Sequence, residues 1–344
     1  MNIFDLVTAP ELTAYWETFS KDRPPYLGET LFPSRKKLGL DLKWIKGSAG
    51  APIVLKASAF DAAAVPRPRI GFDRLSAEMP FFKESTYVDE EMRQQLNMVM
   101  ESGNQAYIDS VMSQVFNDEI RLLEAAAARR EMMRMSALTS GAISVIANGQ
   151  TYTYDYGVPA SHKAQVSKSW SDPTADIIGD IRGWQDKIEE DTGVKPTRAV
   201  CDSTVWSNIK KNNAISKAIY VVSGGGVTVS DARAKAFLME ELELEVTVYS
   251  KMYKNDTGVA TRYMPADTFV LFPSGTLGNT WFGTTPEESD LLGRAATNVS
   301  ITDTGVAVTT MAKQDPVNVE TKVTMISLPS FEAADQIFIG DVTA

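Results

Sequence analysis

The sequence has few of the residues that most often carry catalysis or bind metal. Its 344 residues include a single histidine, His162, and a single cysteine, Cys201. Zinc sites made of several His and Cys ligands therefore cannot be built within one chain, and Cys201 has no partner for an internal disulfide. A Ser-His-Asp or Cys-His centre would depend entirely on His162. The remaining reactive groups are carboxylates, lysines, tyrosines and hydroxyls, so few classes of enzyme are left.

Basic charge and long apolar runs are also scarce. The chain has 34 Lys and Arg against 44 Asp and Glu, a net charge of -10, whereas proteins that read nucleic acids usually carry a basic patch. No run approaches the roughly 18 apolar residues that a bilayer span needs, and the first residues lack the pattern of a secretory signal. A lone cysteine fits a reducing compartment. We expect a soluble, cytoplasmic protein of about two domains, with no membrane contact.

The candidates for a reactive site favour structural interpretations. His162 lies in a polar stretch without periodicity and is expected to be a solvated loop residue. Cys201 follows two apolar residues and is expected to be an inert buried thiol. Gly224, Gly225 and Gly226 lack both the Lys of a Walker loop and the spacing of a dinucleotide loop, so they indicate a mobile loop. We expect no catalytic, cofactor-binding or metal-binding residue.

Charged side chains gather in three clusters. The two acidic clusters comprise Glu240, Glu241, Glu243 and Glu245, and further along Glu287, Glu288 and Asp290. Alternation with apolar residues predicts that Glu243 and Glu245 mark the solvent face of a strand. Guanidinium groups pair well with carboxylates across an interface. That role is predicted for the basic cluster, which consists of Arg67, Arg69 and Arg74.

Residues 1–34 predict a short amphipathic helix followed by an extended arm. Aromatic and apolar residues recur at helical spacing, and the run Arg23-Pro24-Pro25-Tyr26 then breaks the pattern. Exposed aromatic surface is unfavourable, so the segment must dock on the protein's own core or on a neighbouring subunit. Both alternatives stay open, and the side chains concerned are Tyr15, Trp16, Phe19 and Tyr26.

Residues 35–87 predict a long protruding β-hairpin. One apolar face at period two is formed by Leu38, Leu40, Leu42 and Trp44. The prolines at 66 and 68 exclude a central strand there, because proline cannot donate to the ladder.

Val88 to Ser136 predicts one long helix that lies across a sheet. Its apolar stripe includes Val115, Ile120, Leu123 and Ala127. The weak point of the helix is the run at 102–104, Ser-Gly-Asn.

Residues 160–265 predict an α/β module. A helix is expected to begin at 172–174, with Pro173 in its first turn, and to end at Thr192-Gly193. Further elements are a strand over 199–201, a helix capped by Ser203-Thr204, a helix over 232–240 and a strand over 244–249. The last eighty residues are predicted to be mostly β, with strands over 267–273 and 337–339 and a pairing of 299–310 with 317–326.

Four short stretches carry a resemblance to a known family. They are Leu42 to Gly47 followed by Ala51-Pro52, the strand from Tyr263 to Leu271, and the segments Gln314-Asp315-Pro316 and Leu328-Pro329-Ser330. Each is short, and their weight comes from their order along the whole chain. With them the sequence resembles the major capsid protein E family of lambda-like tailed bacteriophages, which has the HK97-type capsid fold.

The resemblance implies an α+β, HK97-like fold with five parts. Residues 1–34 would be the N-terminal arm, 35–87 the extended loop, and 88–159 a peripheral domain with the spine helix. Residues 160–265 would be the axial domain, whose loop Gly224–Gly226 points to the capsomer centre. Residues 266–344 would complete both domains with β segments.

The resemblance also implies a function: a major capsid protein that forms the pentamers and hexamers of an icosahedral shell around double-stranded DNA. Implied partners are other copies of the chain, a scaffold protein, a portal and a decoration protein. The shell would be assembled in the host cytoplasm and retained in the virion. Two other classes are an encapsulin shell around cargo enzymes, which shares the fold, and an enzyme that uses carboxylates.

One assembly hypothesis joins these expectations. Extensions at 15–26 and 52–73 would cross to neighbouring subunits from a rigid body, carrying the aromatic and arginine contacts named above. Deleting residues 1–26 is then expected to leave soluble protein that forms no stable shells, and normal shells would contradict the proposed arm.

Overall fold

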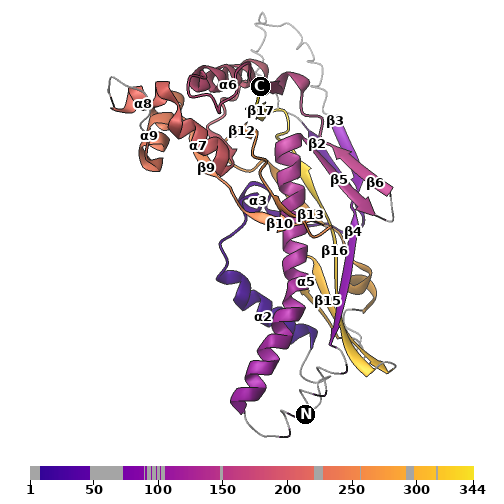
Figure 1. Ribbon diagram of the computed structural model, residues 1–344. Helices are drawn as coiled ribbons and strands as arrows, with labels where there is room; N and C mark the ends of the chain where they lie inside the picture. The colour runs from indigo at the N-terminus through magenta and orange to yellow at the C-terminus, as the bar shows by residue number, and fades with distance from the viewer. Residues whose placement is uncertain are drawn as a thin grey trace, which may run out of the picture. The chain divides into compact units, whose positions relative to one another are not determined.

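The computed structural model describes residues 8–46, 73–88, 105–147, 150–220, 228–255, 257–291, 298–314 and 317–344, with residues 90, 94, 98 and 101 in addition (Figure 1). The chain forms two compact units. Unit 1 consists of Met1–Leu42, Ser76–Arg134 and Asn279–Ser330, and unit 2 of Lys43–Leu75, Met135–Gly278 and Phe331–Ala344. None of the helices in the described ranges has the length and hydrophobicity to cross a membrane.

Unit 1 is built on a mixed sheet. Its strand order is β1 (Ser34–Lys36), β13 (Gly278–Phe282), β16 (Val317–Phe331), β15 (Val306–Gln314) and β14 (Asn298–Thr302). β4 (Phe81–Val88) also pairs with β16, antiparallel from Val319↔Val88 to Ile326↔Phe81. β16 thus holds together strands that are far apart in the sequence. Along its other edge, β4 has no partner strand among the described residues.

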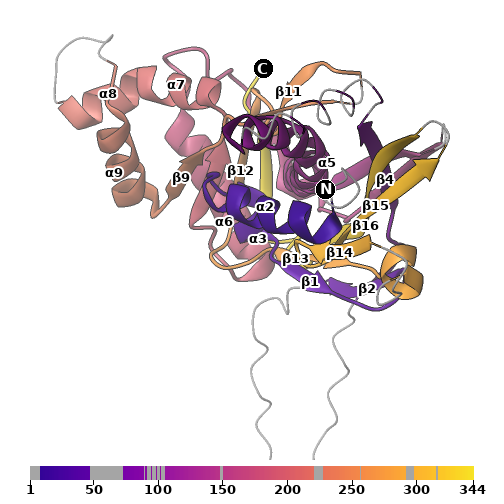
Figure 2. The same ribbon diagram turned by 90° about the horizontal axis from the view of Figure 1, so that it is seen from below.

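Three helices cover this sheet in unit 1: α2 (Ala9–Lys21), α3 (Leu27–Leu31) and the first part of α5 (Gln105–Ser140). The Thr8 side chain caps α2, and Leu12 and Trp16 form its buried face. α2 lies beside β14 (Figure 2). One apolar core contains this face of α2, residues 115–127 of α5, and side chains of β15 and β16.

The long helix is confirmed with different ends. Val88 lies in β4, and the helix continues to Ser140, four residues beyond the predicted end. Val115, Ile120, Leu123 and Ala127 are buried in the unit 1 core, as the stripe predicted. The predicted weak point at 102–104 lies outside the described residues.

The predicted hairpin at 35–87 is present at its base, where β2 (Asp41–Lys46) pairs with β3 (Asp73–Glu78). The prediction of one apolar face on this hairpin is partly wrong. Leu42 is buried, but Leu38 is 83% exposed and Leu40 is 44% exposed. The strand begins only at Asp41, after a turn at Gly39 with φ of 84°. Period-two alternation therefore does not apply to the residues before it. The tip, with Arg67 and Arg69, and the Arg74 side chain lie outside the described residues.

Unit 2 has a second mixed sheet, in the order β7 (Lys163–Gln165), β17 (Phe338–Asp341), β12 (Thr268–Phe272), β8 (Arg198–Cys201) and β9 (Glu245–Val248). Its helices are α6 (Ile177–Thr192), α7 (Ser203–Lys211), α8 (Asn213–Tyr220) and α9 (Asp231–Leu242). Two small hairpins, β5 (Ala142–Ala147) with β6 (Gln150–Asp155) and β10 (Met252–Lys254) with β11 (Ala260–Arg262), belong to the same unit. The predicted α/β module therefore takes two of its strands, β12 and β17, from the last eighty residues.

Two predicted helix starts in unit 2 are wrong by a few residues. α6 begins at Ile177, because the Asp176 carboxylate accepts a hydrogen bond from the Gly179 N–H at 3.1 Å. Asp172 instead closes a turn by accepting from the N–H of Thr174 at 2.7 Å. α7 is capped by Asp202 rather than by Ser203-Thr204. The predicted end of α6 at Gly193 is confirmed by its φ of 72°.

The β-rich tail is confirmed with one correction. Residues 299–310 are two strands, β14 and β15, joined by a turn at 303–305, and β15 pairs with β16 as predicted. The turn has positive φ at Asp303 (46°) and Thr304 (73°), which apolar alternation does not reveal.

Candidate functional site

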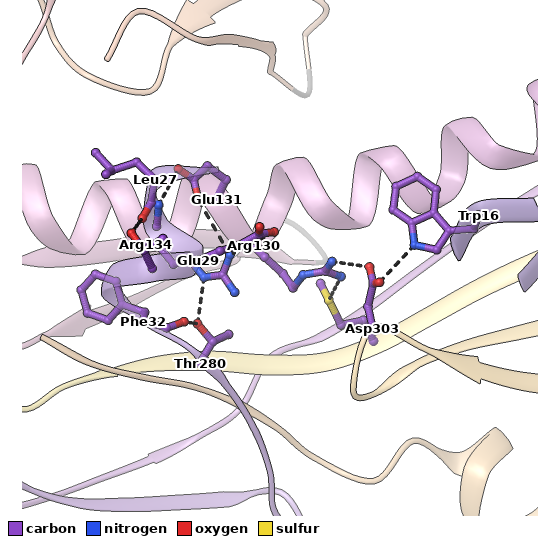
Figure 3. A network of polar contacts seen from close by, with 12 residues as sticks. Trp16, Leu27, Glu29, Phe32, Arg130, Glu131, Arg134, Thr280 and Asp303 are labelled. Atoms are coloured by element: carbon purple, nitrogen blue, oxygen red, sulfur yellow. Dashed lines mark hydrogen bonds and ion pairs between the residues drawn. The ribbon is translucent and has the colours of Figure 1, made fainter. Parts of the chain in front are cut away.

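Unit 1 contains a buried polar network on α5, which Figure 3 shows from close by. Arg130, Glu131 and Arg134 are only 4%, 0% and 1% exposed. Positions 130 and 134 are one helical turn apart, so both side chains project from the same face of α5. We call these three residues and their partners Trp16, Gly28, Thr280 and Asp303 the α5 polar network.

One half of the network is centred on Asp303 in the β14–β15 turn. Its Oδ2 accepts a hydrogen bond from Arg130 Nη2 at 2.6 Å, and its Oδ1 accepts one from Trp16 Nε1 at 3.1 Å (Figure 3). Aspartate tolerates the left-handed backbone of this turn better than most residues. The turn thereby presents one carboxylate to α2 and α5 together.

The other half holds α3 against α5 and β13. Glu131 Oε1 accepts a hydrogen bond from the Gly28 N–H at 3.0 Å. Arg134 Nε donates to Thr280 Oγ1 at 2.8 Å, and that hydroxyl donates to the Phe32 carbonyl at 2.9 Å. Gly28 fits because it has no side chain, since a Cβ there would lie 2.4 Å from Glu131 Oε2.

Burial governs the electrostatics of the network. Desolvation, followed by repulsion from Arg130, lowers the pKa of Arg134 to about 10, so the guanidinium stays charged at neutral pH. Its carboxylate neighbours are Glu131 at 3.8 Å and Glu29 at 3.9 Å. Buried charges are tolerated only when such partners are in place. The network therefore ties α2, α3, α5, β13 and the β14–β15 turn into one body, which is a mechanical rather than a chemical role.

A groove in unit 1 lies between α5 and β4 and has a volume of about 420 Å³. It is lined by Glu84 to Val88 on β4 and by residues of α5 that include Asp118, Glu119 and Arg121. Glu119 is only 3% exposed, and its Oε2 has no hydrogen-bond partner within the described part of the chain. Desolvation raises the pKa of Glu119 to about 7, which the nearby Thr321 hydroxyl only partly offsets.

The predicted aromatic contacts near the N-terminus come together inside unit 1. Trp16 is 3% exposed, and Tyr15, Phe19 and Tyr26 pack half-buried against the same core. The Tyr15 ring stacks on Phe116 at 5.6 Å. Of the two alternatives for this segment, the structure shows docking on the protein's own core. A contact of the same side chains with a neighbouring subunit stays a prediction.

The single histidine is not the solvated loop residue that the sequence suggested. His162 is 1% exposed, its Nε2 lies 3.0 Å from Asp191 Oδ2, and its ring stacks on Phe338. The polar sequence around it gave no sign of this burial, because the ring is covered by α6 and β17 from distant parts of the chain. Cys201 is confirmed as a buried thiol, and desolvation raises its pKa to about 12.

The acidic clusters divide between surface and interior. Glu243 and Glu245 are exposed as predicted, but only Glu245 lies on a strand, because Glu243 is the C-cap of α9 with φ of 53°. Glu287 is only 4% exposed: it accepts a hydrogen bond from Thr324 at 2.9 Å and pairs with Lys322 at 2.7 Å. Across the described ranges, no group of three or more His, Cys, Asp or Glu could hold a metal ion. Gly224, Gly225 and Gly226 lie outside those ranges.

Substituting Gly28 by alanine tests the close approach of α3 to α5. We expect Gly28→Ala to lower the free energy of unfolding by about 1–3 kcal/mol, because the new methyl group overlaps Glu131 and Arg134. Gly183→Ala is the control: Gly183 is an open helical site, where alanine should stabilise by up to about 1 kcal/mol. Urea unfolding of dissociated subunits measures both, and equal effects would contradict the close approach.

Substituting Arg134 tests the network itself. Arg134→Met should cost about 3–5 kcal/mol in unfolding free energy, since it leaves Glu131 buried without its cation. Arg121→Met on the same helix should change stability by less than about 0.5 kcal/mol, because that side chain is 76% exposed. Thermal and urea unfolding give the comparison, and similar losses in both variants would exclude a special role for Arg134.

The raised pKa of Glu119 in the groove predicts that the free energy of unfolding depends on pH. Glu119 holds its proton more tightly when folded, with a pKa of about 7, than when unfolded, with a pKa near 4.5. Stability should therefore fall as pH rises from 4.5 to 7, by up to about 3 kcal/mol, and level off above. Glu119→Gln should remove this fall, whereas the exposed Glu240→Gln should keep it. Urea unfolding at intervals from pH 4.5 to 8.5 makes the comparison, and an unchanged slope in Glu119→Gln would contradict the assignment.

Several solved structures of phage-related proteins have the same fold as this chain. Among solved structures, a prophage protein from E. coli CFT073 superposes with a TM-score of 0.62 at 16% identity, covering 98% of this chain and 99% of that one. A phage-related protein from Bordetella bronchiseptica RB50 superposes with a TM-score of 0.56 at 13% identity. The superposition covers 98% of this chain and 97% of that one. A chain of the capsid asymmetric unit of cyanophage A-1(L) superposes with a TM-score of 0.55 at 11% sequence identity, covering 92% of each chain. These likenesses establish a shared fold.

Sequence comparison establishes the family. No curated protein matches the chain, but residues 8–342 match the family described as phage major capsid protein E. This match favours the phage capsid over the encapsulin alternative. Because it covers nearly the whole chain, the protein belongs to the phage major capsid protein E family and has the HK97-type capsid fold.

Proposed function

We propose that this major capsid protein forms pentamers and hexamers, which build an icosahedral shell around double-stranded DNA in the host cytoplasm. The family match over residues 8–342 is the observation that carries the proposal. A scaffold protein, a portal and a decoration protein are its proposed partners. The net charge of -10 suits a wall that encloses DNA without binding it by sequence.

Each unit would have its own part in the shell. Unit 1, with its spine helix α5, would be the peripheral domain, and the five-stranded sheet of unit 2 with α6 to α9 would be the axial domain. The loop Gly224–Gly226 would then line the capsomer centre. The α5 polar network supports this division, because its contacts join α2, α3, α5, β13 and the β14–β15 turn within unit 1.

The extensions would provide contacts between subunits. The extended loop over 35–87 would place Arg67, Arg69 and Arg74 against carboxylates of a neighbour, with Tyr15 and Tyr26 adding partly exposed aromatic surface. Deletion of residues 1–26 would not test this cleanly. It also removes Leu12 and Trp16 from the unit 1 core, so loss of shells could reflect unfolding.

Electron microscopy of the purified protein tests the class of function. We expect negatively stained samples to show rings or closed shells, together with a high sedimentation coefficient. A stable monomer at high concentration would contradict the proposal.

The arginines of the extended loop provide a sharper test. A variant with Arg67, Arg69 and Arg74 all changed to Gln should raise the concentration needed for assembly about tenfold or more, with unchanged thermal unfolding of the subunit. The control is Arg182→Gln, which removes an exposed guanidinium of α6 paired with Glu241 at 3.5 Å. Equal assembly by both variants would exclude the loop arginines from the interface.

A further inference from the structure

The groove between α5 and β4 contains a buried carboxyl group, Glu119, that has no cation partner among the described residues of unit 1. Asp118 pairs with Arg121, at 3.4 Å, on the same helix. Glu84 is exposed on β4, and Glu119 is buried with Oε2 unpartnered within the described ranges. Among the described residues, Glu84 and Glu119 therefore have no cation partner, and Glu119 is almost fully removed from water.

The position of Glu119 makes this imbalance unfavourable. On the sheet side its neighbour is Thr321 of β16, a residue 1% exposed that carries no charge. The ionisable groups along the groove are Asp118 and Arg121 on α5, and Glu84 and Tyr87 on β4. Arg121 is the only cation among the described residues that line the groove, and its side chain is 76% exposed and directed to Asp118. A buried carboxylate without a partner is costly, and a cation that entered the groove would relieve that cost.

From this geometry we propose that the groove binds a basic side chain of a second copy of this chain, with Glu119 as its carboxylate partner. The inference rests on the proposed self-assembly. A volume of about 420 Å³ accommodates a lysine or arginine side chain with part of its backbone. The described residues offer no cluster that could hold a metal ion in its place.

A second copy is the occupant that charge and family favour. The groove carries three carboxylates and one guanidinium, so it selects for a basic group. Tyr87 at its rim is 65% exposed, and amphipathic aromatic residues are enriched where protein surfaces meet. In a capsid shell the surface met most often is that of another copy, and the chain supplies 34 lysines and arginines.

Binding of a cation couples assembly to protonation. The free subunit holds a proton on Glu119 up to a pH of about 7, because burial raises the pKa of its carboxyl. A cation in the groove stabilises the ionised form, so the carboxyl loses this proton to solvent when two copies associate. Association should therefore strengthen as pH rises to about 7 and stay constant above that pH.

Sedimentation of the full chain between pH 5.5 and 8.5 measures this coupling. For the unaltered protein we expect the association constant per contact to rise about tenfold per pH unit up to pH 7. Glu119→Gln should match it at pH 5.5 but bind about 10- to 100-fold more weakly at pH 8, while remaining folded. Glu240→Gln, exposed on α9, should follow the unaltered protein throughout. Parallel curves for Glu119→Gln and the unaltered protein would overturn the proposal.

A photocrosslinking residue at Tyr87 identifies the occupant. In assembled particles it should link to a peptide of a second copy that contains Lys or Arg. Linkage to another protein, to a peptide without a basic residue, or to nothing would overturn the proposed occupant. Failure of the unaltered protein to assemble at any pH would instead count against the proposed self-assembly, so the two failures are distinguishable.

Discussion

Unit 1 depends on the burial of three charged side chains on one helix. Arg130, Glu131 and Arg134 are almost fully removed from water, and this is favourable only while their partners are in place. Those partners belong to α3, β13 and the β14–β15 turn, and Asp303 of that turn also accepts a hydrogen bond from Trp16 of α2. Loss of any one partner leaves a buried charged or polar group without its ion pair or hydrogen bond, so we expect these elements to be stable together or not at all.

This constraint suits a shell subunit better than an enzyme. The polar groups of the network bind one another, and its result is a fixed position for the N-terminal helices on the long helix α5. A capsid protein must keep one body rigid while its extensions reach different neighbours. Glu119, on the same helix, differs because its carboxyl group is buried with no cation partner among the described residues, and the proposed contact with a second copy would supply one.

The sequence predicted the parts of the fold that depend on local pattern. The stripe of α5, the end of α6 at Gly193 and the strand at Cys201 all follow from spacing, glycine chemistry or apolar runs. It missed the positive φ of Asp303, which apolar alternation does not reveal, and two features that depend on distant contacts: the burial of His162 and the α5 polar network. Arg130 and Arg134 stand in an Ala- and Met-rich stretch, the one local signal that two buried cations were present.

Native-state hydrogen exchange tests the central claim, that the network makes unit 1 a single cooperative body. The amide of Gly28, bonded to Glu131, and the amides of α2 and β15 should exchange with the same free energy of opening as residues 115–134 of α5. Exchange of α2 and α3 at a much lower free energy, with α5 still protected, would show that the N-terminal segment opens independently and would contradict the claim.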